Sequence, residues 1–298
     1  MTDQDVTARA AAKPRIALLG EFSAGKSTLA NALLGQDSSP VRVTATQVPP
    51  IWYSAGSDDP VHVGIDGTET VIDHDEISRI PVLGTRAVRV FLEADLLDAV
   101  DLIDMPGSSD PNMSSDIWDA LLPLADIVLW CTPASQAWRQ SEAAIWEGVP
   151  EELQARSLLL LTRIDTVRNE VDRARLLARV RRETAGQFRA VLPVSPLLAM
   201  EAGDDADLQR ASGLPRLMDV LAEVVADLRA PARRTADIAA DLRRARAGDS
   251  GAPGPDGAGD GAGAEPQVPQ GAPSGVMPRR IRPAGGAARP GRPREALI

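Results

Sequence analysis

The chain has 298 residues, of which 44% are hydrophobic, enough to bury the core of one large domain or two small ones. Its net charge of -10 and its 3% aromatic content count against a nucleic-acid partner and against a base-stacking surface. The single cysteine, Cys131, excludes an internal disulfide, and no apolar run reaches the roughly 18 to 20 residues of a membrane span. We therefore expect a cytoplasmic protein.

Strand and helix patterns alternate from residue 14 to residue 230, after a polar, alanine-rich segment (residues 1–13) that we expect to be disordered. Apolar runs predict buried strands at residues 15–20, 102–104, 127–131, 158–162 and 191–194. Helical patterns lie at residues 26–34, 115–122, 141–146, 170–184 and 214–228. This alternation predicts a three-layer α/β domain in which helices cover both faces of a mostly parallel sheet.

An antiparallel edge is expected before the second buried strand. Asp66-Gly67 is a hairpin turn signal between the apolar segments 61–65 and 68–72. Residues 88–92 predict one more strand in the same region. A ligand of such a fold binds beyond the carboxyl ends of the parallel strands.

The last part of the chain differs in composition from the rest. Residues 231–247 predict a charged helix, and residues 248–298 contain twelve glycines and nine prolines. Such a segment cannot bury enough apolar surface to offset its ordering entropy, so we expect a disordered tail. Asp249, Asp256, Asp260 and Glu265 come first, and the arginines from Arg279 to Arg294 follow them. The tail is either a solvated tether or an arm that contacts anionic lipid or an acidic partner.

A phosphate-binding motif directly follows the first strand. The motif residues are Gly20, Glu21, Phe22, Ser23, Ala24, Gly25, Lys26 and Ser27, with Thr28 next in the helix. This is the G-x-x-x-x-G-K-[ST] pattern, in which loop amides and a helix N-terminus surround a phosphate. Lys26, one of only two lysines, is expected to reach the β- and γ-phosphates, and Ser27 to ligate Mg²⁺.

A second phosphate and metal element lies at the end of the second buried strand, as Asp104-Met105-Pro106-Gly107. An aspartate at a strand end can hold Mg²⁺ through water, and the Gly107 N–H can bind the γ-phosphate. The alternative is a simple proline–glycine turn.

A base-recognition element follows the strand at residues 158–162. Thr162-Arg163-Ile164-Asp165 resembles the [NT]-K-x-D guanine motif with arginine in place of lysine. The Asp165 carboxylate would accept hydrogen bonds from guanine N1–H and the 2-amino group, which adenine lacks, and this counts against an ATPase. Arg163 could lie flat over the base. Ser195 falls where such proteins place a loop against the base.

These motifs, taken in order, resemble the bacterial dynamin-like GTPases. The likeness rests on residues 20–35 and on Asp104-Met105-Pro106-Gly107-Ser108, and it extends over residues 14–230. It implies GTP or GDP as the bound nucleotide and Mg²⁺ as the metal. It also implies a threonine that closes on Mg²⁺ and the γ-phosphate; Thr44 and Thr46 are candidates, and we favour Thr46. Lys26, Ser27, Thr46 and Asp104 are then the expected catalytic set.

Two positions depart from related GTPases. Ser108 stands where Ras-like proteins have a glutamine, and Phe22 stands where eukaryotic dynamins have one. A glutamine there orients the attacking water, so we expect slow intrinsic turnover that a homodimer across the nucleotide face accelerates. Arg139 is a candidate for stabilising charge on the phosphates.

Several interpretations stay open. The chain could be a GTPase switch, a non-catalytic GTP-gated interaction module, or a ribosome-assembly GTPase of the Era type. A protein partner or peripheral contact with the inner face of the membrane is compatible with the sequence. Trp138 and Trp146 are eight residues apart, the spacing of one helical face, and are either core residues or a dimer patch.

Overall fold

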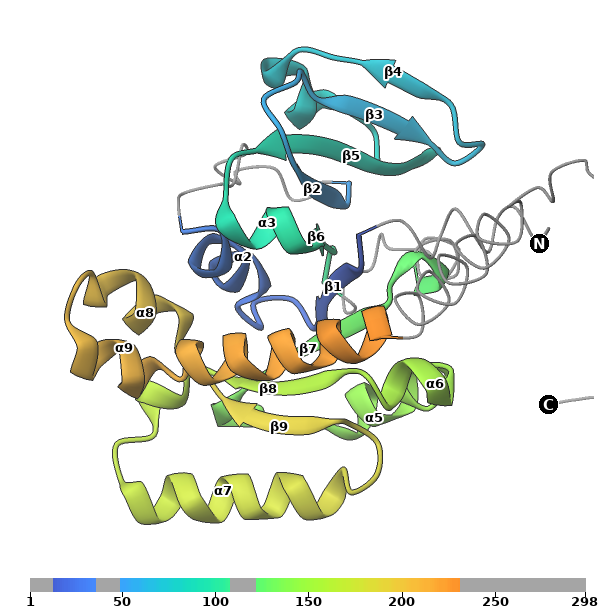
Figure 1. Ribbon diagram of the computed structural model, residues 1–298. Helices are drawn as coiled ribbons and strands as arrows, with labels where there is room; N and C mark the ends of the chain where they lie inside the picture. The colour runs from blue at the N-terminus through green and yellow to red at the C-terminus, as the bar shows by residue number, and fades with distance from the viewer. Residues whose placement is uncertain (1–12, 36–48, 108–121, 231–298) are drawn as a thin grey trace, which may run out of the picture. The chain divides into compact units, whose positions relative to one another are not determined.

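A nine-stranded sheet runs through the part of the chain that the computed structural model describes, residues 13–35, 49–107 and 122–230 (Figure 1). The strand order is β4-β3-β5-β2-β6-β1-β7-β8-β9. The strands are β1 (Arg15–Gly20), β2 (Ile51–Ala55), β3 (Val61–Gly64), β4 (Glu69–Val71), β5 (Thr85–Leu92), β6 (Asp101–Asp104), β7 (Ile127–Pro133), β8 (Leu158–Thr162) and β9 (Ala190–Pro193).

The sheet is parallel on one side and mixed on the other. Strands β6, β1, β7, β8 and β9 pair in parallel. Strand β2 is antiparallel to β6 and parallel to β5, while β3 is antiparallel to both β5 and β4. The predicted antiparallel edge and its hairpin at Asp66-Gly67 are therefore confirmed. Strand β2 was not predicted.

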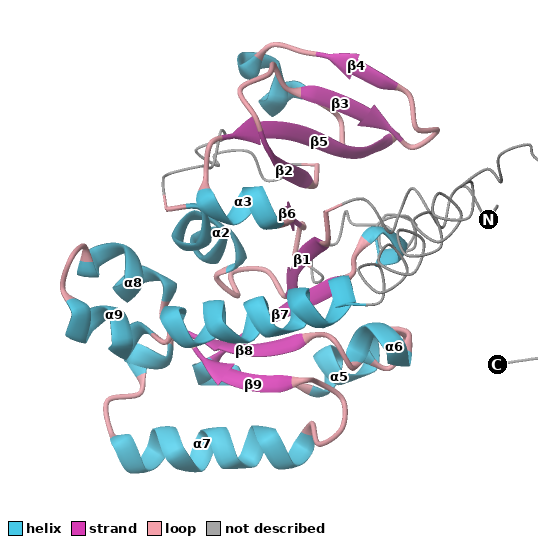
Figure 2. Cartoon of the chain, in the orientation of Figure 1, coloured by secondary structure: helices cyan, strands magenta, loops and turns pink. Residues whose placement is uncertain are grey.

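Helices connect most of these strands (Figure 2). The α-helices are α2 (Lys26–Leu34), α3 (Asp95–Ala99), α5 (Gln140–Trp146), α6 (Glu151–Gln154), α7 (Glu170–Glu183), α8 (Pro196–Ala202), α9 (Ala206–Ser212) and an unlabelled helix at residues 214–230, coloured orange in Figure 1. Short 3-10 helices are η1 (His74–Arg79), η2 (Leu122–Leu124), η3 (Ala134–Gln136) and η4 (Ile164–Thr166). The predicted helix at residues 115–122 lies outside the described residues except for its last residue. The predicted segments 231–247 and 248–298 lie wholly outside them.

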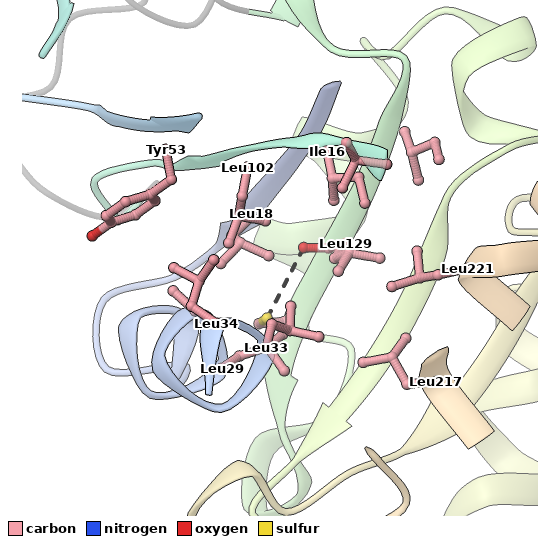
Figure 3. Close-up of a cluster of buried hydrophobic side chains, with 14 of the residues drawn as sticks. Ile16, Leu18, Leu29, Leu33, Leu34, Tyr53, Leu102, Leu129, Leu217 and Leu221 are labelled. Carbon is pink, nitrogen blue, oxygen red and sulfur yellow. Dashed lines mark hydrogen bonds between the residues drawn. The ribbon is translucent and has the colours of Figure 1, made fainter. Parts of the chain in front are cut away.

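Alternate residues of each central strand enter different layers of the core. On β1, Ile16 and Leu18 belong to the cluster that includes α2 and the helix at residues 214–230 (Figure 3). Ala17 and Leu19 belong to a second cluster, which includes residues of α5, α6 and α7. Because a strand's side chains alternate between faces, helices cover both faces of the sheet. The three-layer α/β prediction is confirmed.

The tryptophans are core residues of the second cluster. Trp146 is fully buried, 5.4 Å from the Trp130 ring and 4.3 Å from the Phe188 ring, and Trp138 is 9% exposed. The prediction that Trp138 and Trp146 share a helical face is wrong. Helix α5 begins only at Gln140, and Trp138 has a left-handed φ of 59°.

Among the described residues, every helix is too short or too polar to span a lipid bilayer. Lys13, the last residue of the segment predicted to be disordered, donates a 2.8 Å hydrogen bond to the main-chain oxygen of Leu97. Residues 1–12 lie outside the described part of the chain.

Candidate functional site: a phosphate loop and a base-recognition element

The phosphate loop (residues 20–27) joins β1 to α2 through left-handed backbone. Gly20 has a φ of 137°, Ser23 a φ of 60° and Gly25, the N-cap of α2, a φ of 88°. A Cβ atom on Gly20 would collide with the main-chain oxygen of Cys131 on the neighbouring strand β7. Glycine is therefore required at the point where the strand becomes the loop.

The Lys26 ammonium folds back over this loop. Lys26 is 7% exposed, and its Nζ donates to the main-chain oxygens of Gly20 at 3.0 Å and Glu21 at 2.9 Å. Burial lowers the pKa of Lys26, while the nearby Asp104 charge raises it. The loop thus holds a cation among its own carbonyls, at the N-terminus of α2, where a phosphate would be favoured.

Asp104 lies at the carboxyl end of β6, beside the phosphate loop. Its pKa is raised by burial, although a hydrogen bond from the Ser27 side chain and the charge of Lys26 lower it. Among the described residues, the buried Asp104 Oδ1 has no hydrogen-bond partner. A buried carboxylate oxygen that lacks a partner, beside a serine hydroxyl, fits the oxygen ligands that Mg²⁺ prefers. The residues present therefore fit the predicted metal.

Gly107 packs directly against the phosphate loop. A Cβ atom on Gly107 would lie 2.7 Å from the Phe22 nitrogen and 2.8 Å from the Phe22 Cα. Real Cβ atoms do not approach main chain so closely, so only glycine allows this contact. The Asp104–Gly107 element and the phosphate loop are therefore neighbours. This is required if the loop and the Gly107 N–H are to bind the phosphates of one nucleotide. The Phe22 side chain is 72% exposed.

The end of β8 is tied to the same loop. Thr162 Oγ1 donates to the Ala24 oxygen at 2.7 Å, and Arg163 Nη2 donates to the Ser23 oxygen at 2.9 Å. Arg163 has a left-handed φ of 54° and is the N-cap of η4, which contains the exposed Asp165. The Arg163 guanidinium therefore binds the main chain of the phosphate loop. That it lies flat over a bound base stays a prediction.

Ser195 adjoins this base-recognition element. Val194 accepts a 3.4 Å hydrogen bond from the Ile164 nitrogen, which joins η4 to the start of α8. Ser195 is 1% exposed, and its Oγ accepts from the Leu198 nitrogen at 3.4 Å as the N-cap of α8. The serine therefore has a helix-capping role here.

The carboxyl ends of β1, β6, β8 and β9 bring together the described predicted residues. Residues 20–28 form the turn from β1 and the start of α2. Asp104 and Thr162 end β6 and β8, and the residues that follow strand ends are Gly107, Arg163, Asp165 and Ser195. Thr44, Thr46 and Ser108 lie outside the described residues. The predicted threonine switch therefore stays a prediction.

The structure adds an ion pair that the sequence did not predict. Arg139 Nη1 lies 3.0 Å from Glu21 Oε2, and Ser141 Oγ donates to Glu21 Oε1 at 2.9 Å. Arg139, proposed from the sequence as a charge-stabilising residue, thus contacts the phosphate loop through its second residue. The contact depends on β7 lying next to β1, which the order of elements along the chain does not specify.

A buried carboxylate, also not predicted, holds the start of α5. Glu142 is 1% exposed and accepts hydrogen bonds from Trp130 Nε1 at 2.9 Å, Thr132 Oγ1 at 3.0 Å and the Arg139 nitrogen at 2.9 Å. Burial raises the pKa of Glu142, although these hydrogen bonds lower it. The available sequence signal was a glutamate three residues after the N-cap, the capping-box position.

Comparison with known proteins identifies the family. The family model described as "Dynamin family" matches residues 16–164. Dynamin-like protein 2 of Campylobacter jejuni subsp. jejuni is 25% identical over 162 aligned residues, and the match covers 52% of this chain and 26% of that protein. This chain therefore spans about a quarter of the length of that curated relative.

Solved structures agree on the fold. Two structures of an oligomerised bacterial dynamin pair are 22% identical to this chain and superpose with TM-scores of 0.55 and 0.56. Each match covers 76% of this chain and 37% of the solved chain. Because the family model matches half of its residues and its phosphate loop lies in a P-loop GTPase fold, the chain belongs to the dynamin family.

Proposed function

We propose that this chain binds GTP and, with Mg²⁺, hydrolyses it to GDP and phosphate as a dynamin-like molecular switch with slow intrinsic turnover. The observation that carries the proposal is the grouping of Lys26, Ser27 and Asp104 at the adjacent carboxyl ends of β1 and β6. Ser27 and Asp104 would hold Mg²⁺, which neutralises charge on the phosphate oxygens when it is bound. Lys26 and the loop amides would bind the phosphates.

The remaining residues have distinct proposed roles. The Gly107 N–H would bind the γ-phosphate, and Thr46 would close on it to complete the active state. Asp165 would accept hydrogen bonds from guanine, with Arg163 and Ser195 beside the base. The hydrogen bonds from Thr162 and Arg163 to the phosphate loop support this arrangement, because they fix the base element relative to the phosphate site.

We further propose that turnover depends on a second copy at the nucleotide face. The support is the side chain of Phe22, which is apolar and 72% exposed in the phosphate loop. A second copy would cover this ring and supply groups that orient water.

Membrane contact is a separate proposal. The related structures are of an oligomerised bacterial dynamin pair, described as providing a mechanism for long-range sensing and tethering of membranes. For this chain we propose peripheral contact with the inner face of the membrane, in which the arginines of residues 279–294 are attracted to anionic lipid.

Phe22 also favours a second candidate, a GTP-gated interaction module that does not hydrolyse its nucleotide. A phenylalanine cannot orient the attacking water as a glutamine does. The partner of such a module would dock where Thr46 and Gly107 respond to the γ-phosphate.

Phosphate release at saturating GTP, measured over a range of protein concentrations, separates these candidates. We expect a slow rate per molecule that rises with protein concentration, with Lys26→Ala as the inactive control. Tight GTP binding without release at any concentration would favour the interaction module. A fast rate that is independent of concentration would contradict the slow, dimer-dependent mechanism. Addition of anionic liposomes tests the membrane proposal, which predicts stimulated release.

A further inference from the structure

The phosphate loop contains an acidic residue, Glu21, whose negative charge would affect the binding of an anionic phosphate. The Glu21 side chain is 12% exposed, and its carboxylate contacts Arg139 Nη1 at 3.0 Å and Ser141 Oγ at 2.9 Å. A poorly solvated negative charge in this loop would repel an anionic phosphate unless a cation compensates it. Arg139 is the cation placed against it.

The backbone around Arg139 is firmly fixed. Trp138, just before it, has a left-handed φ of 59°, a conformation that costs free energy for a bulky residue. The Trp138 nitrogen donates to Thr132 Oγ1 at 3.2 Å, and the Arg139 nitrogen donates to Glu142 Oε2 at 2.9 Å. These buried acceptors hold the segment in place, so Arg139 is presented to the loop from a rigid support.

Glu21 also contacts Lys26, through its main chain. Its main-chain oxygen accepts a 2.9 Å hydrogen bond from Lys26 Nζ, while its carboxylate pairs with Arg139. If Arg139 were removed, the Glu21 carboxylate would stay in the loop, poorly solvated and without its cation. Its uncompensated charge would then oppose the binding of phosphates to the loop.

We propose that Arg139 is a positioning residue that neutralises Glu21 and so makes the phosphate loop competent to bind a nucleoside triphosphate. This inference rests on the proposed function, because it assumes that the phosphates of a guanine nucleotide occupy this loop. Its effect is larger on GTP than on GDP, since the triphosphate carries more negative charge.

The test is a double-mutant cycle of nucleotide affinity on the full chain. Dissociation constants for GTP and GDP are measured for the wild type, Arg139→Ala, Glu21→Gln and the double variant. We expect Arg139→Ala to weaken GTP binding about tenfold and GDP binding less, and Glu21→Gln to restore most of the lost affinity. A residue that served stability alone would show no such restoration.

Arg189→Ala is the matched control. The Arg189 side chain is 43% exposed, as is that of Arg139, and its Nη2 lies 2.9 Å from Asp227 Oδ2. Arg189 precedes β9, at the end of the sheet opposite to the phosphate loop. The control therefore removes the same charge and an ion pair of similar length, although its partner Asp227 is 64% exposed, and we expect unchanged GTP affinity.

Each outcome is decisive. If the wild type binds GTP and Arg139→Ala binds it equally well, or if the double variant stays as weak as Arg139→Ala, the inference is overturned while the proposed function stands. If the wild type binds no guanine nucleotide, both are overturned. If a circular dichroism melt shows that Arg139→Ala does not fold, GTP and GDP affinities are compared instead for Arg139→Gln alone and for Arg139→Gln combined with Glu21→Gln.

Discussion

Thr162 Oγ1 donates a 2.7 Å hydrogen bond to the main-chain oxygen of Ala24, although 138 residues separate the two in sequence. This bond joins the end of β8, where the base-recognition element begins, to the middle of the phosphate loop. Thr162 is fully buried, so the Ala24 oxygen would have no water to replace the hydroxyl. The two halves of the candidate nucleotide site are therefore mechanically linked.

Thr162→Val removes this link while keeping the shape of the side chain. We expect the free energy of unfolding to fall by about 1–3 kcal/mol, the cost of an unpaired buried acceptor, and GTP affinity to fall with it. Chemical denaturation and nucleotide titration measure the two effects. Thr184→Val is the control: Thr184 is 2% exposed and donates a 2.8 Å hydrogen bond to Val180 at the end of α7. Thr184→Val should lower the free energy of unfolding and leave GTP affinity unchanged. If the two variants lost GTP affinity equally, the proposed link between Thr162 and the phosphate loop would be contradicted.

Gly107→Ala tests the contact between the two phosphate elements. The added methyl group would lie 2.7 Å from the Phe22 nitrogen, so the loops must separate. We expect a stability loss of about 1–3 kcal/mol from overpacking, together with weaker binding of GTP. Gly148→Ala is the matched control, because its Cβ would meet one atom, the Ile145 oxygen, at 3.4 Å. Unchanged GTP affinity in Gly107→Ala would show that the contact is unimportant for binding.

Glu142 gives the fold a defined pH dependence. Burial raises the pKa of Glu142 from its ordinary value of 4.5, and the Glu21 charge adds to this effect. Between pH 4.5 and the raised pKa of the folded state, Glu142 holds a proton in the folded protein that it has lost in the unfolded chain. The contribution of Glu142 to stability therefore falls as the pH rises from 4.5 through the raised pKa.

Glu142→Gln removes this titration. Its amide nitrogen would face a hydrogen-bond donor in either orientation, so we expect a less stable protein overall, by about 1–3 kcal/mol. Because the wild type alone loses stability with rising pH through this group, the difference between the two proteins should shrink toward neutral pH. Denaturation curves at a series of pH values measure it. A difference that grows with rising pH would contradict the assignment.

The sequence predicted those features that short segments determine. Strands β1 and β8 and helix α2 have the predicted bounds, because each is a continuous apolar or amphipathic run with a clear turn signal at its end. The phosphate loop was predictable for the same reason, since its function depends on eight consecutive residues. Strand β2, which lies between β5 and β6 in the sheet, was missed although Ile51, Trp52 and Tyr53 are strand-forming residues between Pro49-Pro50 and Gly56.

Contacts between distant segments could not be predicted in this way. The pairing of Glu21 with Arg139 requires β7 to lie beside β1, and a single sequence does not specify strand order. The spacing of Trp138 and Trp146 was misleading because periodicity assumes one continuous helix, whereas Trp138 precedes α5 in a left-handed conformation. Spacing predicts a shared face only within one element.

Direct titration of the wild-type chain with GTP, GDP and ATP in the presence of Mg²⁺ tests the central claim, that this loop binds a guanine nucleotide. We predict that GTP and GDP bind and that ATP binds at least about a hundredfold more weakly, with Asp165→Ala narrowing that difference. Binding of ATP as tight as that of GTP, or no measurable affinity for either guanine nucleotide, would contradict it.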